Sequence, residues 1–445
     1  MATAKRENFG SRIAVIFAMA GSAIGLGNLW RFPYLAGEQG GAAFVFIYIA
    51  ATLLISLPVF VSEVIIGRRS RCNASDAMIR LAPDRKFWRC IKYLPVIIPT
   101  IIASYYSVIG GWSLDFMFRS CAMQFTKTDP SVVSSVFGEL VSSPWRPLVM
   151  HLVFLVVSTL IVAGGVKSGI EKFSKWSLPL LFVLIVVIAI YSICLPGASA
   201  GIEYLLKPDF SSVTPSTFAY AMGQSFYSLS LGMGTIITYG SYVSKKDNIL
   251  SDGTATAGFD LFFALLAGLA VMPAVFAAGI EPGSGPGLIF QSIPYVFARM
   301  GETMPVLSAV VAILFFLTIV VAAMTSLISL IEVGVAFLME KFALSRVKSC
   351  LVVFVVCAVL GSLCAVEGSV LDFLDWSASN ILLILMAFLV VLFVGFIMKK
   401  EDVKAEFTNN GELSAPGKIF PVYYFLLRWI VPIAILLIFV SNFIL

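Results

Sequence analysis

Long apolar stretches alternate with short polar segments along the whole chain. A helix needs about 20 apolar residues to cross the hydrocarbon core of a bilayer, and eleven stretches of the sequence reach about that length. They cover residues 11–36, 41–66, 93–120, 147–164, 174–195, 215–240, 254–279, 304–338, 350–366, 371–398 and 420–444. The segments between them are too short for a soluble domain. We therefore predict an all-α polytopic membrane protein with eleven transmembrane helices, forming a single membrane domain over residues 1–445.

Two of these stretches are interrupted midway by glycine and polar residues. GSAIGLGNLWRFP, residues 21–33, lies in the first span, and GQSFYSLSLGMGTIITYGSY, residues 223–242, lies in the sixth. Backbone polar groups inside a membrane must be satisfied by the protein, by ions or by substrate. Two interrupted spans at corresponding positions therefore predict a transporter built from inverted repeats, with its binding site between the breaks. Close packing between helices is the alternative interpretation of the glycines.

Basic residues gather in every second connecting segment. With a cytoplasmic N-terminus, the inner segments hold 23 Lys and Arg residues and the outer segments hold five. This asymmetry follows the positive-inside rule. It predicts a multi-pass protein of the cell inner (plasma) membrane, with a cytoplasmic N-terminus and an extracytoplasmic C-terminus. The Lys and Arg residues on the cytoplasmic side of the lipid bilayer also account for the net charge of +5, so no nucleic-acid partner is expected.

Charged groups make up only 12% of the chain, and those inside spans usually face a cavity or a partner. The seven cysteines form no CxxC pair and His151 is the only histidine, so we expect neither a transition-metal site nor an enzyme. Hydroxyl, amide and carboxylate oxygens are more numerous and would suit a hard monovalent cation. Thr325 and Ser326 carry an open alternative, because hydroxyls in helices often bond back to the preceding turn.

The segments AMAGSAIGLGNLWRFPYLAGEQGGAAF, SLSLGMG and AAMTS resemble the neurotransmitter:sodium symporter family, over nearly the whole chain. With eleven spans, the chain resembles the short prokaryotic branch of this family, which includes leucine- and tryptophan-type amino-acid transporters. The resemblance implies a LeuT-like fold, a 5+5 inverted repeat with broken spans 1 and 6. The first repeat would cover residues 1–195 and the second residues 215–398, followed by span 11 at residues 420–444.

The same resemblance implies two sodium ions and one amino-acid substrate. The first sodium site would use Ala23, Asn28, Ser228 and Asp260, the last where the family usually has asparagine. The second would use Gly21, Ile24, Ala322, Thr325 and Ser326. The substrate would meet Ala23, Leu26, Gly27, Ile102, Tyr106, Tyr227, Ser228, Ser230, Met233, Leu327 and Leu330. Tyr105 is also available beside Tyr106, but the second tyrosine fits the family spacing.

Two gates and one flexible helix are implied as well. The outer gate would be Arg31 and Asp375, with Tyr227 as a lid and Asp372 as an alternative acid. The inner gate would consist of Arg6, Phe9, Ser241, Tyr242 and Glu340. Gly169 and Pro179 resemble an element of span 5 that unwinds to release sodium. Proline removes a backbone hydrogen bond and glycine weakens a helix, although ordinary membrane helices contain both residues too.

Departures from the family pattern narrow the expected function. Chloride-dependent members use a tyrosine, a glutamine and two serines; Tyr48, Gln224 and Ser228 match, but the fourth position is Ala264. Asp260 would neutralise the first sodium itself, so we expect no chloride requirement. The apolar lining favours a neutral hydrophobic or aromatic L-amino acid as the imported substrate. Separately, we expect the protein to function as a monomer. A substrate-gated channel or sensor on the same scaffold, and proton coupling through Asp260, stay open as alternatives.

Overall fold

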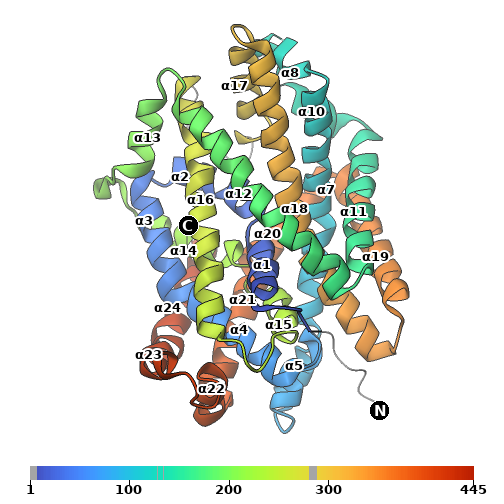
Figure 1. Ribbon diagram of the computed structural model, residues 1–445, viewed down its shortest axis with the longest axis vertical. Coiled ribbons are helices and arrows are strands. Elements are labelled where there is room, and N and C mark those ends of the chain that lie inside the picture. Colours follow the sequence, from blue (N-terminus) through green and yellow to red (C-terminus); the bar gives the residue numbers. More distant parts are fainter. Residues whose placement is uncertain (1–7, 128, 134, 280–287, 445) are drawn as a thin grey trace.

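The computed structural model describes residues 8–127, 129–133, 135–279 and 288–444, and every regular element in those ranges is a helix (Figure 1). Nine helical segments of the described chain are long and apolar enough to cross a membrane. A bent pair of helices, Arg12–Ala23 and Gly27–Glu38, makes a tenth candidate with an angle of 49°. The prediction of an all-helical polytopic membrane protein is confirmed.

The first half of the chain builds five spans from ten helical elements. They are α1 (Arg12–Ala23), η1 (Gly27–Arg31), α2 (Phe32–Glu38), α3 (Ala42–Ala51), η2 (Thr52–Ser56), α4 (Leu57–Ser70), α7 (Leu94–Cys121), α11 (Arg146–Ala163), η3 (Val166–Glu171) and α12 (Lys172–Ile193). The predicted fifth span began at residue 174, whereas the helical segment begins at Val166.

The second half builds the remaining spans. Its elements are α14 (Pro215–Ser228), α15 (Thr235–Gly240), α16 (Ile249–Ala277), α18 (Pro305–Phe342), α19 (Arg346–Val366), α20 (Gly368–Ser377), η6 (Ala378–Leu382), α21 (Leu383–Leu392), η7 (Phe393–Ile397), α23 (Ser414–Phe425), η8 (Leu426–Ile430) and α24 (Val431–Ile444). The predicted sixth span is two helices, α14 and α15, and neither alone is long enough to cross a membrane. Counted as one broken span, they complete the predicted eleven.

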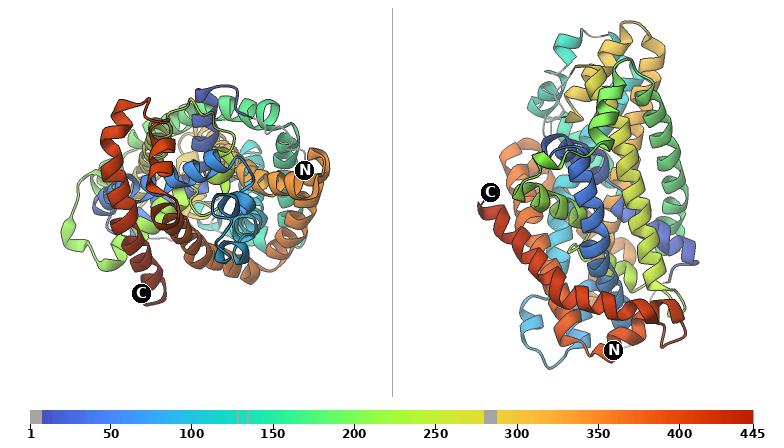
Figure 2. Two further views of the ribbon diagram at one scale, coloured as in Figure 1. Left: turned by 90° about the horizontal axis from the view of Figure 1, so that it is seen from below. Right: turned by 90° about the vertical axis from the view of Figure 1, so that its left-hand side faces the viewer.

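Short helices cap the two ends of the bundle. They are α5 (Ala74–Leu81), α6 (Phe87–Cys90), α8 (Gln124–Lys127), α9 (Pro130–Val133), α10 (Ser135–Ser142), α13 (Ala198–Leu206), η4 (Phe210–Ser212), α17 (Ser292–Gly301) and α22 (Lys400–Phe407). In Figure 1, α5 and α22 lie at the lower end, called here the Phe9 end, and α8, α10 and α17 at the upper end, called the Arg31 end. Both views in Figure 2 place α23 and α24 on the outside of the bundle.

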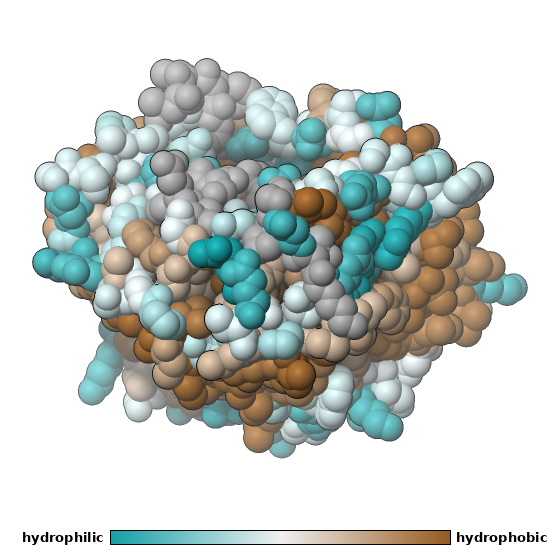
Figure 3. Space-filling view, turned by 90° about the horizontal axis from the view of Figure 1, so that it is seen from above, coloured by the Kyte–Doolittle hydropathy of each residue, from teal (hydrophilic) through white to brown (hydrophobic). Residues whose placement is uncertain are grey.

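Apolar side chains cover the sides of the bundle. Leu160 of α11, Val366 of α19 and Leu437 of α24 are all more than half exposed. Figure 3, viewed from the Arg31 end, shows polar residues gathered on that end and brown hydrophobic residues around the flanks. Such a belt would be unfavourable in water and is what a helix bundle presents to lipid.

Helices α7 and α18 pack along each other, and α1 lies against α12, α16 and α18. Helices α4 and α15 approach each other closely through their backbones. A Cβ atom added to Gly67 would lie 2.1 Å from the carbonyl oxygen of Ile237, and one added to Gly240 would lie 3.0 Å from Cα of Val64. Only glycine permits this approach, which brings the second half of span 6 against span 2.

Candidate functional site

The break in span 1 exposes carbonyl groups without any left-handed residue. Helix α1 ends where Ile24 adopts an extended conformation, with φ −73° and ψ 103°, and the π-helical turn η1 restarts the span at Gly27. The freed oxygens are taken by hydroxyl groups. Ser22 O accepts hydrogen bonds from Ser230 Oγ at 2.9 Å and Ser326 Oγ at 3.1 Å, so three spans meet at one carbonyl.

The break in span 6 is wider and depends on left-handed backbone. Between α14 and α15, three residues have positive φ angles: Ser230 at 54°, Gly232 at 75° and Gly234 at 71°. A Cβ atom on Gly232 would lie 2.4 Å from Leu383 O, so a larger residue is excluded by space as well as by conformation. The Gly232 N–H donates to Oε1 of the buried Glu63 at 2.7 Å, which fixes the break to span 2.

Asp260 of α16 stands at the centre of a buried polar cluster between the two breaks. Asn28 Nδ2 donates to its Oδ1 at 2.8 Å, Ser228 Oγ lies 2.8 Å from both carboxylate oxygens, and Tyr48 OH donates to Oδ2 at 3.2 Å. These donors are an amide, a hydroxyl and a phenol, and all are neutral. The sequence-predicted trio of Asn28, Ser228 and Asp260 is therefore brought together, with Tyr48 as a fourth member.

A second oxygen cluster lies where α1 meets α18. Thr325 Oγ1 donates to Ala322 O at 2.8 Å and lies 3.3 Å from Ile24 O. Gly21 packs here too, because a Cβ atom on it would lie 3.5 Å from Cβ of Thr325 and 3.8 Å from Oγ of Ser174. Four of the predicted residues thus share one place. The fifth, Ser326, directs its hydroxyl to Ser22 O instead.

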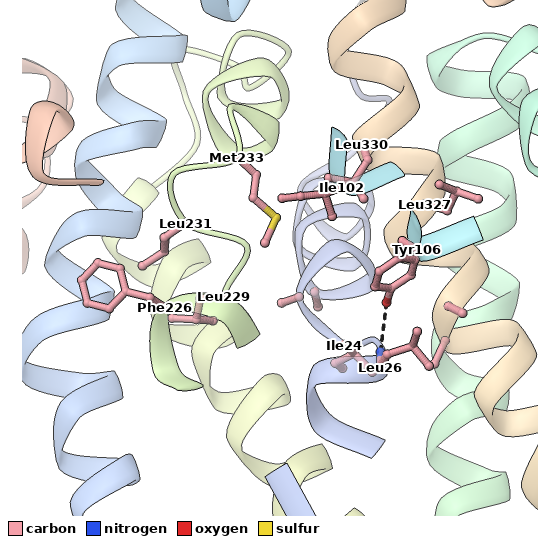
Figure 4. Close-up of a cluster of buried hydrophobic side chains, with 14 of the residues drawn as sticks. Ile24, Leu26, Ile102, Tyr106, Phe226, Leu229, Leu231, Met233, Leu327 and Leu330 are labelled. Carbon is pink, nitrogen blue, oxygen red and sulfur yellow. Dashed lines mark hydrogen bonds between the residues drawn. The ribbon is translucent and has the colours of Figure 1, made fainter. Parts of the chain in front are cut away.

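A small cavity lies between the breaks and α7 and α18. Figure 4 shows Ile102, Met233 and Leu330 together at one side of this region, and Tyr106 reaching the backbone of Leu26. The Leu26 N–H donates to the Tyr106 hydroxyl at 3.0 Å. The lining residues are Ser22, Ala23, Gly25, Gly27, Ile102, Tyr106, Tyr227, Ser230, Met233, Ser326 and Leu330.

Eight of these lining residues belong to the predicted substrate set. Of the others in that set, Leu26 meets the cavity region only through its N–H, Ser228 faces Asp260, and Leu327 is buried in the helix core. Sequence reasoning missed Ser22, Gly25 and Ser326 as lining residues. Ser22 and Gly25 carried a usable signal, since they lie inside the broken segment itself.

At the Arg31 end the predicted gate residues lie near one another, but Arg31 and Asp375 form no ion pair in the described structure. The guanidinium of Arg31 lies over the ring of Tyr227, 5.0 Å from its centroid. Asp375 acts electrostatically on Arg31, yet among the described residues the pair does not reach the 4.0 Å of an ion pair. Asp375 instead accepts a hydrogen bond from Ser379 Oγ at 3.3 Å. Asp372 is exposed, so Asp375 is the better-placed acid.

The Phe9 end is tightly packed. The ring of Phe9 meets Tyr239 and Tyr242 edge-on, with centroids 5.7 and 5.9 Å apart. Tyr242 donates to Oε1 of Glu332 at 2.7 Å, and the N–H of Asn73 donates to Oε2 of Glu340 at 2.7 Å. The predicted Arg6 lies outside the described residues. Ser241 contributes its carbonyl oxygen, which lies 3.3 Å from Nη1 of Arg71.

A cluster of charged residues around Glu406 lies at the same end, and the sequence analysis did not predict it. Glu406 of α22 receives Nε of the buried Arg68 at 2.8 Å and Nζ of Lys245 at 2.6 Å. Burial raises the pKa of this carboxyl, but the hydrogen bond from Lys245 and the charges of Arg68 and Lys245 outweigh it, and the net pKa lies below its usual value. The cluster ties α4, α22 and the segment after α15 together.

Span 5 begins with the π-helical turn η3, which contains Gly169. A Cβ atom on Gly169 would lie 2.0 Å from Ile161 O, so this turn packs against the end of α11 through a glycine. Pro179 lies inside α12 and removes one backbone donor there. The two residues therefore border a stretch whose helix is irregular on one side and short of a hydrogen bond on the other.

Comparisons with known proteins find one family over nearly the whole chain. Residues 6–133 and 125–445 match the model of the sodium:neurotransmitter symporter family. An uncharacterized sodium-dependent transporter of Bacillus subtilis is 36% identical, covering 99% of this chain and 98% of its own length. A second, from Haemophilus influenzae, is 34% identical with 98% of each chain covered. The crystal structure of MhsT in complex with L-phenylalanine is similar with a TM-score of 0.89 and 37% identity, over 98% of this chain and 100% of that one.

Proposed function

This chain belongs to the sodium:neurotransmitter symporter family, a family of sodium-dependent membrane transporters rather than enzymes, and on that premise we propose that it imports neutral hydrophobic or aromatic L-amino acids with sodium. The import proceeds by alternating access and needs no chloride. The observation that carries the proposal is the buried carboxylate of Asp260 between the two broken spans, with only neutral donors around it. A charge buried without a counter-ion is strongly unfavourable, and a bound cation removes that cost.

The first sodium ion takes its oxygens from Ala23 O, Asn28 Oδ1, Ser228 Oγ and the Asp260 carboxylate. Sodium is a hard cation, and such cations prefer several oxygen ligands. The Asn28 amide nitrogen and the Ser228 hydroxyl now bond to Asp260, and Asn28 Oδ1 accepts a hydrogen bond from the Gly25 N–H at 3.2 Å. A cation that enters the cluster exchanges these contacts for its own. The fixed negative charge makes an additional chloride redundant.

The second sodium ion occupies the cluster between α1 and α18. Its ligands are the carbonyl oxygens of Gly21, Ile24 and Ala322 and the hydroxyls of Thr325 and Ser326. Thr325 Oγ1 already contacts two of those carbonyls, which supports this assignment. Release of this ion follows local unwinding of span 5 between Gly169 and Pro179.

The cavity between the breaks receives the substrate. The Tyr106 hydroxyl and the backbone at Leu26 and Gly27 hold the carboxylate, and Ile102, Met233 and Leu330 surround the side chain. None of the lining residues is charged, which favours a neutral amino acid. The similar MhsT structure holds L-phenylalanine, and this supports a substrate of that size. Leu26 contributes its N–H at the cavity, and Ser228, which faces Asp260, and the buried Leu327 support the site from behind its lining.

Transport couples the ions to the substrate through the first sodium site. The substrate carboxylate adds a ligand to that ion, so each raises the affinity for the other. Arg31, Tyr227 and Asp375 close the Arg31 end, and Phe9, Ser241, Tyr242 and Glu340 open at the Phe9 end together with Arg6. The repeats at residues 1–195 and 215–398 rock against each other. The protein acts as a monomer in the plasma membrane with its Phe9 end in the cytoplasm.

Uptake into proteoliposomes tests the proposal. A panel of twenty amino acids is measured with sodium and chloride replaced separately, chloride by gluconate. Sodium-dependent uptake of leucine, phenylalanine or tryptophan is expected, unchanged in gluconate. Asn28→Ala should abolish sodium-dependent binding while the protein stays folded. The proposal is wrong if no neutral amino acid gives a sodium-dependent signal, and its chloride part is wrong if gluconate stops uptake.

A further inference from the structure

Two neighbouring tyrosines of α7 face different surroundings. The Tyr106 hydroxyl is hydrogen-bonded to the backbone of Leu26 beside the cavity. The Tyr105 side chain is equally buried, with 1% of its surface exposed, but its hydroxyl has no hydrogen-bond partner in the described part of the chain. Buried hydroxyls are nearly always paired, and an unpaired one destabilises the conformation that contains it. Tyr105 therefore favours a rearrangement that supplies an acceptor.

An acceptor is close by. The Tyr105 hydroxyl lies within electrostatic reach of Asp375, Ser379 and Tyr227, although none of them meets the geometry of a hydrogen bond with it. Helix α7 packs directly against α20 and η6, which carry Asp375 and Ser379. The Asp375 carboxylate accepts the single hydrogen bond from Ser379 that the structure shows among the described residues. A carboxylate has room for about four donors. Tyr105 and Asp375 thus have unused capacity that matches.

Arg31 belongs to the same cluster. It lies over the ring of Tyr227 and is acted on by Asp375 without forming an ion pair in the described structure. A small movement of span 10 toward α7 would bring Asp375 to the phenol, because helices α7 and α20 already touch. The phenol would then hold the carboxylate in place for the guanidinium.

We propose that Tyr105 is a positioning residue of the gate at the Arg31 end: when the gate closes over substrate, its hydroxyl donates a hydrogen bond to Asp375 and orients that carboxylate toward Arg31. Tyr106 senses the substrate carboxylate and Tyr105, one residue before it, holds the gate. Span 3 thereby links occupancy of the cavity to closure above it. This inference rests on the proposed function, since it assumes that a substrate occupies the cavity.

The test uses the full-length protein in proteoliposomes and labelled L-phenylalanine as the probe. Tyr105→Phe removes only the hydroxyl and keeps the ring in the helix interface. We expect dissociation of L-phenylalanine in saturating sodium to become about tenfold faster, as for loss of one hydrogen bond to a charged group. KM should rise with little change in kcat. Tyr93→Phe, which alters an exposed tyrosine at the start of α7, is the matched control and should behave as wild type.

A double-mutant cycle separates this role from a purely structural one. Tyr105→Phe and Asp375→Asn are measured alone and together, because coupled residues give non-additive effects. We expect Tyr105→Phe to add little once Asp375→Asn is present, because Tyr105 acts through that carboxylate. Additive effects on the dissociation rate, or a Tyr105→Phe protein with wild-type dissociation, would overturn this inference alone. A wild-type protein without sodium-dependent binding of any neutral amino acid would overturn the proposed function, and this inference with it.

Discussion

The two broken spans solve the same problem in different ways. Span 1 breaks over three residues without a positive φ angle, and its freed carbonyls are held by hydroxyl groups of spans 6 and 8. Span 6 breaks over six residues with three in the left-handed region, and its N–H at Gly232 is held by Glu63. The first break therefore presents oxygens, and the second presents a turn of fixed shape.

Because of this difference, we expect the two breaks to have separate roles. Carbonyl oxygens with weak neutral partners can be handed to a cation, because a hydroxyl that loses one acceptor finds another. A backbone N–H held by a buried carboxylate keeps its place. We therefore expect substitutions near the first break to change ligand affinity, and substitutions in the second to change stability of the fold.

The largest expected effect comes from the carboxylate between the breaks. Asp260→Asn keeps the size of the side chain and removes its charge. Loss of one member of a buried charge pair costs about 3 kcal/mol or more, so sodium affinity should fall on the order of 100-fold. Binding of L-phenylalanine across a sodium titration measures this, with Asp372→Asn as the control at an exposed acid. Unchanged sodium dependence in the Asp260 variant would remove Asp260 from the ion site.

A methyl group at the first break should be the next most damaging change. A Cβ atom on Gly25 would lie 2.3 Å from Ser326 Oγ and 2.6 Å from the Tyr106 hydroxyl. Overpacking of this kind costs about 1–3 kcal/mol, so Gly25→Ala should weaken amino-acid binding by about 5- to 150-fold. Gly223→Ala, where the added Cβ meets nothing within 4 Å, is the control. Equal affinity in both variants would show that the cavity is not the substrate site.

The second break should respond through stability. Gly232→Ala places a side chain at a φ of 75° and 2.4 Å from Leu383 O. The conformational strain alone is about 1–2 kcal/mol, so the thermal unfolding midpoint in detergent should fall by at least about 1–2 °C in a chain of this length. Gly258→Ala in α16 has open space and serves as the reference. If the midpoint stays constant while affinity drops, the division of work between the breaks is wrong.

The smallest expected effect is at the bridge between the breaks. Ser230 Oγ donates to Ser22 O at 2.9 Å, and Ser230→Ala removes that bond. One neutral hydrogen bond is worth about 1 kcal/mol, so KM should change by no more than about fivefold. Ser142→Ala, an exposed serine that bonds only within α10, gives the baseline. A loss as large as that of Asp260→Asn would show that Ser230 contributes far more than this bridge.

The sequence showed the two breaks because glycine and polar residues interrupt otherwise apolar runs, a local signal that needs no knowledge of packing. The chain itself could not show which oxygens meet. Adjacent residues on a helix point about 100° apart, so the sequence could not show that the Ser326 hydroxyl bonds to Ser22 O while the Thr325 hydroxyl bonds to Ala322 O. The Glu406 cluster was invisible for a similar reason, since Arg68, Lys245 and Glu406 are distant in sequence and only folding brings them together.

The glycine contact between α4 and α15 has a mechanical consequence. Because Gly67 and Gly240 bring the two backbones into contact, no side chains separate the helices at this point, and α4 and α15 move as one rigid unit. At one end of this unit, the N–H of Gly232 is bonded to Glu63 of α4, and at the other end Arg68 of α4 is bonded to Glu406 of α22. A tilt of these helices that starts near the cavity therefore also moves α22, the connector between the last two spans. The Glu406 cluster is the contact through which this movement is passed on.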